Sequence, residues 1–162
     1  MEDIQWNHLR EVLNRYAEVF IRKAQDHLQE NGSIASGTLS ESMVPYKVEI
    51  EDDAFRVYLE IEDYWKYVEN GRGPGRYPPV DKIEKWITDK PIAPQPDNNG
   101  RIPTVKQLSF LIGRKIAEEG TTPQPFFERS KEETWEDMEE TVYDAIREDI
   151  AEYVASLIGD IK

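Results

Sequence analysis

The most unusual stretch of this chain is WKYVENGRGPGRYPPVDKIEKWI, residues 65–87. An aromatic run leads into a glutamate and a loop dense in glycine, arginine and proline, and a short helical pattern follows. Glycine lets a chain turn tightly and proline stiffens it, so the segment predicts a rigid bend. Three roles for the loop follow from these residue types: holding a phosphate, joining two packed elements, or gripping a neighbouring subunit.

Upstream of this loop the pattern is first helical and then alternating. Residues 4–30 place apolar side chains at three- and four-residue steps, which predicts an amphipathic helix that Asn31-Gly32 would end. Residues 43–51 and 55–62 alternate apolar with polar positions around an acidic turn, which predicts an antiparallel hairpin. Residues 64–71 fit either a helical turn or a third strand.

Downstream of the loop three helices are expected. One begins at Pro79 and the next runs from the N-cap Thr104 to Glu119, while the proline-rich segment 90–103 reads as an exposed loop. The last covers residues 127–158, and its expected apolar stripe is Trp135, Met138, Val142, Ile146, Ile150, Tyr153 and Leu157.

The predicted fold class is therefore α+β, in a single domain over residues 1–162. It has a long N-terminal helix, a small antiparallel β-sheet, short helices and a long C-terminal amphipathic helix that extends over residues 127–160.

Composition excludes several classes of protein. The chain has no cysteine, which removes disulfides and cysteine-ligated metals, and no apolar run approaches the roughly 20 residues that cross a bilayer. The net charge is −13, so the backbone of a nucleic acid would be repelled. The acidic faces fit two interpretations: they keep the protein in solution, or they line a passage along which DNA slides.

No catalytic set is visible. The two histidines, His8 and His27, are nineteen residues apart on the first helix and are expected at surface or boundary positions. The glycine loop lacks both the Walker spacing and the dinucleotide fingerprint, so we expect no enzyme activity, no cofactor and no metal. Arg72 and Arg76 are instead expected to pair with carboxylates, including those of another subunit.

Four short motifs, taken in order, resemble a family of tailed-phage minor tail components, also called tail-completion or head–tail joining (neck) proteins. They are a small-Gly-x-Leu-x-x-Ser element, an aromatic-Val-Glu-x-Gly element, a Pro-Pro helix ending in Trp-Ile, and an Ile-x-x-x-Gly-Thr-x-Pro-x-Pro-Phe element. The matching residues are Ser36, Gly37, Leu39 and Ser42; Tyr67, Val68, Glu69 and Gly71; Pro78, Pro79, Trp86 and Ile87; and Ile116, Gly120, Thr121, Pro123, Pro125 and Phe126.

The resemblance implies a non-enzymatic virion component, made in the cytoplasm of the bacterial host, that forms a ring, often of six copies, between the head connector and the tail tube. Its implied partners are further copies of itself and the connector and tail-tube proteins. DNA would pass through the ring without specific binding, and no membrane would be involved.

We predict that the subunit interface lies around the loop and that two phenylalanines serve as its apolar anchors. The alternative is that these side chains pack within their own chain. The predicted interface residues are Trp65, Glu69, Arg72, Arg76, Tyr77, Phe126 and Phe127. Two other functions stay open: an acidic binding module that mimics DNA or inhibits a basic partner, and a nucleotide-dependent enzyme using the glycine loop.

Overall fold

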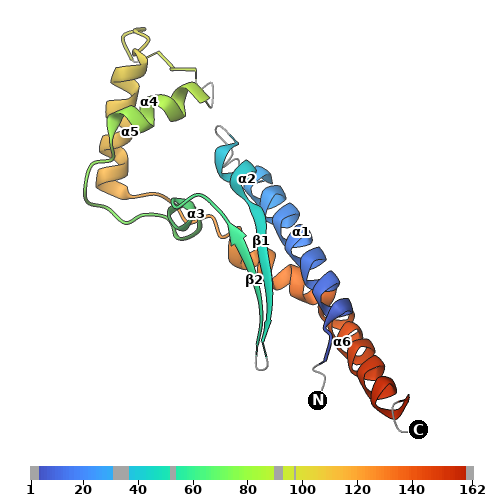
Figure 1. Cartoon of the computed structure of the whole chain (residues 1–162). Helices are drawn as coiled ribbons and strands as arrows, with labels where there is room; N and C mark the ends of the chain where they lie inside the picture. The colour runs from blue at the N-terminus through green and yellow to red at the C-terminus, as the bar shows by residue number, and fades with distance from the viewer. Residues whose placement is uncertain (1–3, 31–36, 52–53, 90–92, 97, 160–162) are drawn as a thin grey trace. The chain divides into compact units, whose positions relative to one another are not determined.

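The computed structural model describes residues 4–30, 37–51, 54–89, 93–96 and 98–159, and over these residues the chain is α+β (Figure 1). The order is α1 (Asn7–Glu30), α2 (Thr38–Ser42), β1 (Val44–Glu51), β2 (Ala54–Glu60), α3 (Trp65–Asn70), α4 (Val80–Asp89), α5 (Val105–Glu119) and α6 (Phe127–Gly159). The predicted fold class is confirmed. None of the helices described combines the length and the apolar character that crossing a bilayer requires.

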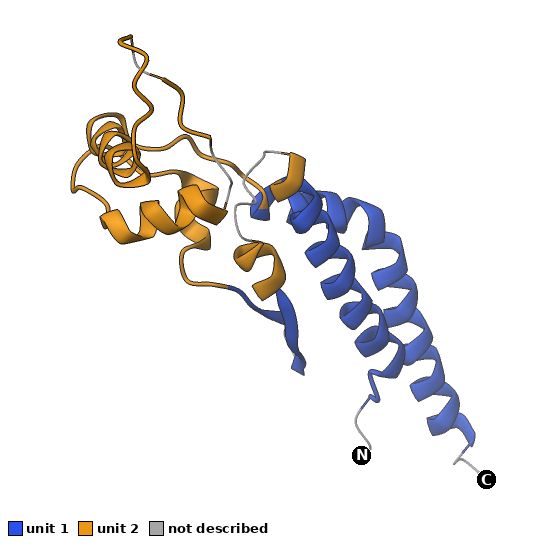
Figure 2. Cartoon of the chain, turned by 90° about the horizontal axis from the view of Figure 1, so that it is seen from above, with its two compact units in different colours: residues 1–27, 43–61, 127–162 blue, residues 28–42, 62–126 orange. Residues whose placement is uncertain are grey.

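The chain divides into two compact units, coloured separately in Figure 2. Unit 1 draws on residues 1–27, 43–61 and 127–162, and unit 2 on residues 28–42 and 62–126. Unit 1 is thus assembled from three distant pieces of sequence. The single domain over residues 1–162 stays a prediction.

Unit 1 is built on two long antiparallel helices, α1 and α6, which lie side by side in both views (Figures 1 and 2). Leu9 and Leu13 of α1 form a buried cluster with Val142 and Ala145 of α6. The hairpin packs against this cluster through Val48, Ile50 and Val57. Burying each large aliphatic side chain stabilises the unit by about 1.5–3 kcal/mol.

The face that α6 buries differs from the predicted one. Met138 and Val142 are buried as expected, but Trp135 is 42% exposed, Ile150 41% and Leu157 42%. The buried positions of α6 are Ser130, Thr134, Met138, Val142, Ala145 and Asp149, so four of the six carry small or polar side chains. Small side chains let two helices approach closely. Of the predicted stripe, Met138, Val142 and Ile146 lie in or against the core, whereas Trp135, Ile150 and Leu157 are exposed.

The predicted hairpin is confirmed, with one irregularity. Strands β1 and β2 pair antiparallel from Val44↔Glu60 to Glu51↔Ala54, and the register shifts between Pro45 and Lys47. Such a bulge redirects side chains, and Tyr46, expected on the same face as Val48, is 62% exposed. The centre of the predicted turn, residues 52–53, lies outside the described residues.

Unit 2 contains the short helices. Residues 65–70 form helix α3 and not a strand, and α4 begins directly after Pro79. Helix α5 starts at the predicted N-cap: the Thr104 hydroxyl accepts a hydrogen bond from the Gln107 N–H, and the Gln107 side chain accepts one from the Thr104 N–H. The short helix α2 was not predicted, and the predicted helix end at Asn31-Gly32 falls outside the described residues.

Candidate functional site

The glycine/proline loop, residues 71–79, closes on the segment 120–124 within unit 2. Arg72 and Thr121 form an isolated antiparallel bridge. The Arg72 N–H donates to the Thr121 carbonyl at 3.2 Å, and the Thr121 N–H donates to the Arg72 carbonyl at 2.7 Å. We call these two segments, joined by this bridge, the joint.

Two more backbone hydrogen bonds extend the joint. The Gln124 N–H donates to the Val68 carbonyl at 2.9 Å, and the Gly75 N–H donates to the Ala117 carbonyl at 2.8 Å. The joint therefore ties the end of α3 and the loop to the end of α5 and the chain that follows it.

The joint depends on two glycines. Gly71 has φ +66 and Gly120 has φ +82, a region that L-residues with side chains rarely adopt. A Cβ at Gly71 would overlap the Thr121 carbonyl oxygen, and a Cβ at Gly120 would overlap the Arg72 carbonyl oxygen. Only hydrogen fits where these two backbone segments cross.

The same geometry bears on the phosphate-binding interpretation. A phosphate cradle needs several free N–H groups converging on one point. In this loop the Arg72 and Gly75 N–H groups already donate to chain carbonyls, and prolines at 74, 78 and 79 have no N–H to offer. The geometry therefore favours a joint between packed elements over an anion cradle.

Beside the joint, unit 2 opens a cavity of about 670 Å³ between α3, α4, α5 and the segment after α5. We call it the aromatic groove. Its lining residues are Tyr64, Tyr67, Val68, Arg72, Pro78, Lys82, Ile83, Trp86, Ile112, Ile116, Thr121, Thr122 and Gln124.

The aromatic groove combines exposed rings with positive charge. Tyr67 is 64% exposed, Tyr64 41% and Trp86 38%. Its charged lining residues are Arg72 and Lys82, and none of the described lining residues is acidic. The chain has a net charge of −13, so a surface without acidic lining residues differs from the rest of it. Exposed aromatic rings and arginine are typical of protein-binding surfaces.

Three of the predicted interface aromatics pack inside the chain. The Tyr77 hydroxyl donates to the Phe110 carbonyl at 2.7 Å, and its ring lies so close to α5 that a Cβ at Gly113 would be 2.6 Å from it. Phe126 is 0% exposed, and Phe127 meets Phe20 edge-on with ring centroids 4.9 Å apart. Intramolecular packing, the alternative interpretation, describes the positions of these three residues.

The other predicted interface residues lie on α3 and in the loop that follows it. Trp65 is partly buried and Glu69 is buried at 9% exposure. The Arg72 guanidinium donates to the Arg76 carbonyl, and Arg76 is exposed. Within the described part of the chain neither arginine forms an ion pair with a carboxylate, so pairing with another subunit stays a prediction.

Sequence reasoning left several groove residues out of the predicted interface. Lys82 and Trp86 lie four residues apart on α4 and border the groove together with Tyr64 and Tyr67. Residues four apart on a helix share a face, and this spacing was the available signal. It did not reveal that α3 and the segment after α5 complete the same cavity.

Among the described residues of unit 1, the most buried acidic side chain is a carboxylate that caps a helix. Asp149 of α6 is 1% exposed. It accepts hydrogen bonds from the Leu9 N–H at 2.9 Å, the His8 N–H at 3.0 Å and the His8 Nδ1 at 2.8 Å. These N–H groups belong to the first turn of α1, where N–H groups lack helical partners.

The surroundings shift the pKa of both partners. Burial alone would raise the pKa of Asp149, but the hydrogen bonds from Leu9 and His8 outweigh it and lower that pKa below 3.8. The pKa of His8 is raised above 6.5, chiefly by its hydrogen bond to Asp149 and further by Glu152 and Glu148, against some desolvation.

The same corner holds a set of possible metal ligands. His8, Asp149 and Glu152 offer ligand atoms within 4.8 Å of one another. Among the described residues, this is the group of three side chains that is close enough to hold a metal ion. Both Asp149 oxygens already accept hydrogen bonds from the start of α1. The cluster is therefore explained as a helix cap.

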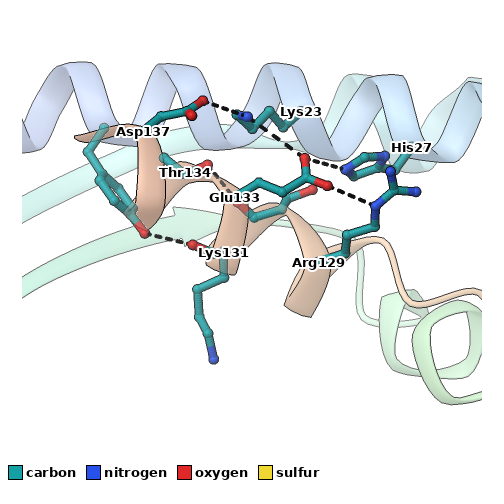
Figure 3. Close-up of polar contacts among 9 residues, drawn as sticks. Lys23, His27, Arg129, Lys131, Glu133, Thr134 and Asp137 are labelled. Atoms are coloured by element: carbon teal, nitrogen blue, oxygen red, sulfur yellow. Dashed lines mark hydrogen bonds and ion pairs between the residues drawn. The ribbon is translucent and has the colours of Figure 1, made fainter. Parts of the chain in front are cut away.

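A second polar cluster joins the C-terminal turns of α1 to the N-terminal turns of α6 (Figure 3). Glu133 of α6 accepts from His27 Nε2 at 3.0 Å and from Arg129 Nε at 2.8 Å, while Lys23 reaches Asp137 at 2.8 Å. Partial burial would raise the pKa of Glu133, but Arg129 and His27 lower it overall. His27 is only 5% exposed, so the expectation of a surface or boundary histidine is wrong.

Comparison with known proteins adds no relative: no protein-family model, no curated protein and no solved structure matches this chain.

Proposed function

We propose that this chain is a non-enzymatic structural subunit of a tailed-phage virion, a head–tail joining or tail-completion protein that assembles into a ring between the connector and the tail tube. It would be made in the host cytoplasm and carried in the finished particle.

The observation that supports this proposal best is the convergence of two motifs on one joint. The Val-Glu-x-Gly element around Gly71 and the Gly-Thr-x-Pro element around Gly120 are about fifty residues apart in the sequence. They meet at the bridge between Arg72 and Thr121, where each needs its glycine. Two of the four motifs behind the family resemblance thus serve one structural purpose, which supports the proposal.

The exposed charges fit the same role. Outside its buried stripe, α6 presents many carboxylates, including Glu132, Glu136, Glu140, Asp144 and Glu148, all of which are exposed. A ring that turns these faces toward its lumen would repel the DNA backbone, so that DNA slides through without binding.

The test is charge reversal at the joint. Replacing both Arg72→Glu and Arg76→Glu should prevent ring assembly, because carboxylates of a neighbouring copy would meet negative charge. The monomer should stay folded, since neither guanidinium pairs with a carboxylate in the described chain. Sedimentation velocity measures assembly, and far-UV circular dichroism measures folding.

A matched control reverses two exposed cations on α5, Arg114→Glu and Lys115→Glu, whose ion pairs among the described residues are with Glu118 and Glu119 one turn away. This control has the same change in net charge and should assemble like the original protein. Unchanged assembly of the Arg72/Arg76 variant would defeat the proposed interface.

The acidic face of α6 supports a second candidate, an acidic module that binds a basic partner. The two functions differ in stoichiometry. A DNA mimic or inhibitor would bind a basic protein as a single copy and would not self-assemble beside connector proteins, whereas the proposed subunit forms a ring of several copies.

A further inference from the structure

The last ten residues of α6 carry an apolar stripe that nothing described in unit 1 covers. Helix α6 runs on to Gly159 after Asp149 has capped the start of α1, which extends it by about 15 Å at 1.5 Å per residue. Along this part, the α6 end, Ile150 is 41% exposed, Val154 45%, Leu157 42% and Ile158 65%.

The spacing of these four residues places them on one side of the helix. Steps of four, three and one residues keep the side chains within one face of an α-helix. An amphipathic helix that lays such a face into an apolar groove is a common mode of recognition. The α6 end therefore has the form of a ligand for a groove.

The aromatic groove of unit 2 has the complementary chemistry. Its charged lining residues are the cations Arg72 and Lys82, whereas the α6 end contains Glu152 and no lysine or arginine, and the exposed Glu148 lies just before it. The last turn of α6 has no basic residue, so the negative end of the helix dipole is not offset there. Rings and aliphatic side chains in the groove suit the apolar stripe.

The α6 end cannot enter the groove of its own chain. Gln124, which lines the groove, comes only three residues before the start of α6 at Phe127, a stretch of about 10 Å at most. Along one continuous helix, Ile150 lies about 35 Å and Ile158 about 47 Å from Phe127. This distance holds in any orientation of the two units, so the occupant must come from another molecule.

We propose that the aromatic groove of one copy receives the α6 end of a second copy of this chain. The inference rests on the proposed function, for which it names the contact between subunits. The two partners of this contact are different surfaces, so each copy uses its α6 end toward one neighbour and its groove toward the other. Such head-to-tail contacts build a closed ring when the rotation from one copy to the next adds up to a full turn after a whole number of copies.

The test blocks each surface separately in the full-length chain. The groove-blocked variant carries Tyr67→Asp with Lys82→Glu, and the end-blocked variant carries Leu157→Asp with Ile158→Asp. Each should weaken self-association by about 100-fold, measured by sedimentation velocity over a range of concentrations. Mixed together, they should form a one-to-one dimer and nothing larger, because one functional contact is left.

Two controls carry equally exposed side chains elsewhere. Tyr46 is 62% exposed and Ile102 67%, close to Tyr67 at 64% and Ile158 at 65%. Tyr46→Asp and Ile102→Asp should leave self-association unchanged. Normal assembly of either blocked variant, or equal weakening by the controls, would overturn the proposal.

Because the chain has no cysteine, crosslinking provides a second measurement that also detects weak association. A chain with both Tyr67→Cys and Leu157→Cys, treated with a bismaleimide, should give a ladder of multimers, whereas either single variant should give at most a dimer. Absence of the ladder overturns the proposal.

The two proposals fail in different ways. If the chain forms rings with connector proteins but the ladder is absent, the groove contact is wrong and the proposed function stands. If the ladder forms but no ring appears under any condition, the groove contact stands and the proposed function is wrong.

Discussion

The two units hold together by different physical means. In unit 1, helices far apart in sequence are joined by a buried apolar cluster and by charged side chains, with Asp149 capping α1 and Glu133 binding His27. In unit 2, backbone crosses backbone at the joint, and glycines at 71 and 120 make the crossing possible. Unit 1 should therefore respond to the loss of a charge or a change of pH, and unit 2 to the addition of a single methyl group.

The largest expected effect is that of Gly120→Ala. The new Cβ would overlap the Arg72 carbonyl oxygen, and the alanine would have to keep the positive φ of Gly120. We therefore expect the free energy of unfolding to fall by about 3 kcal/mol or more. Hydrogen exchange should show faster exchange across residues 62–126 and little change in α1 and α6.

The matched control is Gly73→Ala, in the same loop. A Cβ at Gly73 meets nothing within 4 Å, so this variant should be neutral or slightly stabilised. If Gly73→Ala and Gly120→Ala lowered the free energy of unfolding equally, the overlap of a Cβ with the Arg72 carbonyl would not explain the effect at Gly120.

The next effect is that of Asp149→Asn. An amide offers one acceptor oxygen where the carboxylate offers two, and it places N–H groups against the donors of α1. We expect the free energy of unfolding to fall by about 2 kcal/mol, as measured by urea unfolding. Hydrogen exchange should show that the loss of protection lies in unit 1. Asp144→Asn, an exposed position that pairs only with Arg147 within the described chain, should change stability by less than about 0.5 kcal/mol. If the Asp149→Asn variant lost hydrogen-exchange protection in unit 2 alone, Asp149 would not be the cap that stabilises unit 1.

The smallest effect is that of pH on unit 1. Asp149 has a lowered pKa, so its contribution is present above its unfolded pKa near 3.8 and is lost as the pH falls through the lower folded value. His8 has a raised pKa, so its contribution is present below pH 6.5 and is lost as the pH rises through the higher folded value.

An NMR titration of the His8 ring measures this directly. The midpoint should lie above 6.5 in the original protein, and Asp149→Asn should lower it more than Glu152→Gln, because the hydrogen bond to Asp149 is the larger cause. A larger effect of Glu152→Gln would show that the charge of Glu152, and not the cap, sets this pKa.

Local signals in the sequence predicted the elements well. The N-cap at Thr104, the helix after Pro79 and the hairpin all depend on neighbouring residues, and each lies where it was expected. The aromatic groove forms only where α3, α4, α5 and the segment after α5 come together in space. No short sequence pattern predicts contacts between segments so far apart in the chain.

The error in α6 has a physical cause. Periodicity located the apolar stripe that includes Trp135, Ile150 and Leu157, but the face of α6 that is buried carries small and polar side chains beside Met138 and Val142. A hydrophobic pattern shows which residues avoid water and does not name the surface that covers them. Beyond Asp149 this stripe stays exposed in the described chain, and there it becomes the proposed contact with the next subunit.

Electron microscopy of the purified full-length chain, alone and mixed with connector proteins, tests whether it forms a ring. We expect closed rings with a fixed number of copies and an open centre. Particles that contain a single copy of the chain at every concentration, with or without connector proteins, would contradict it.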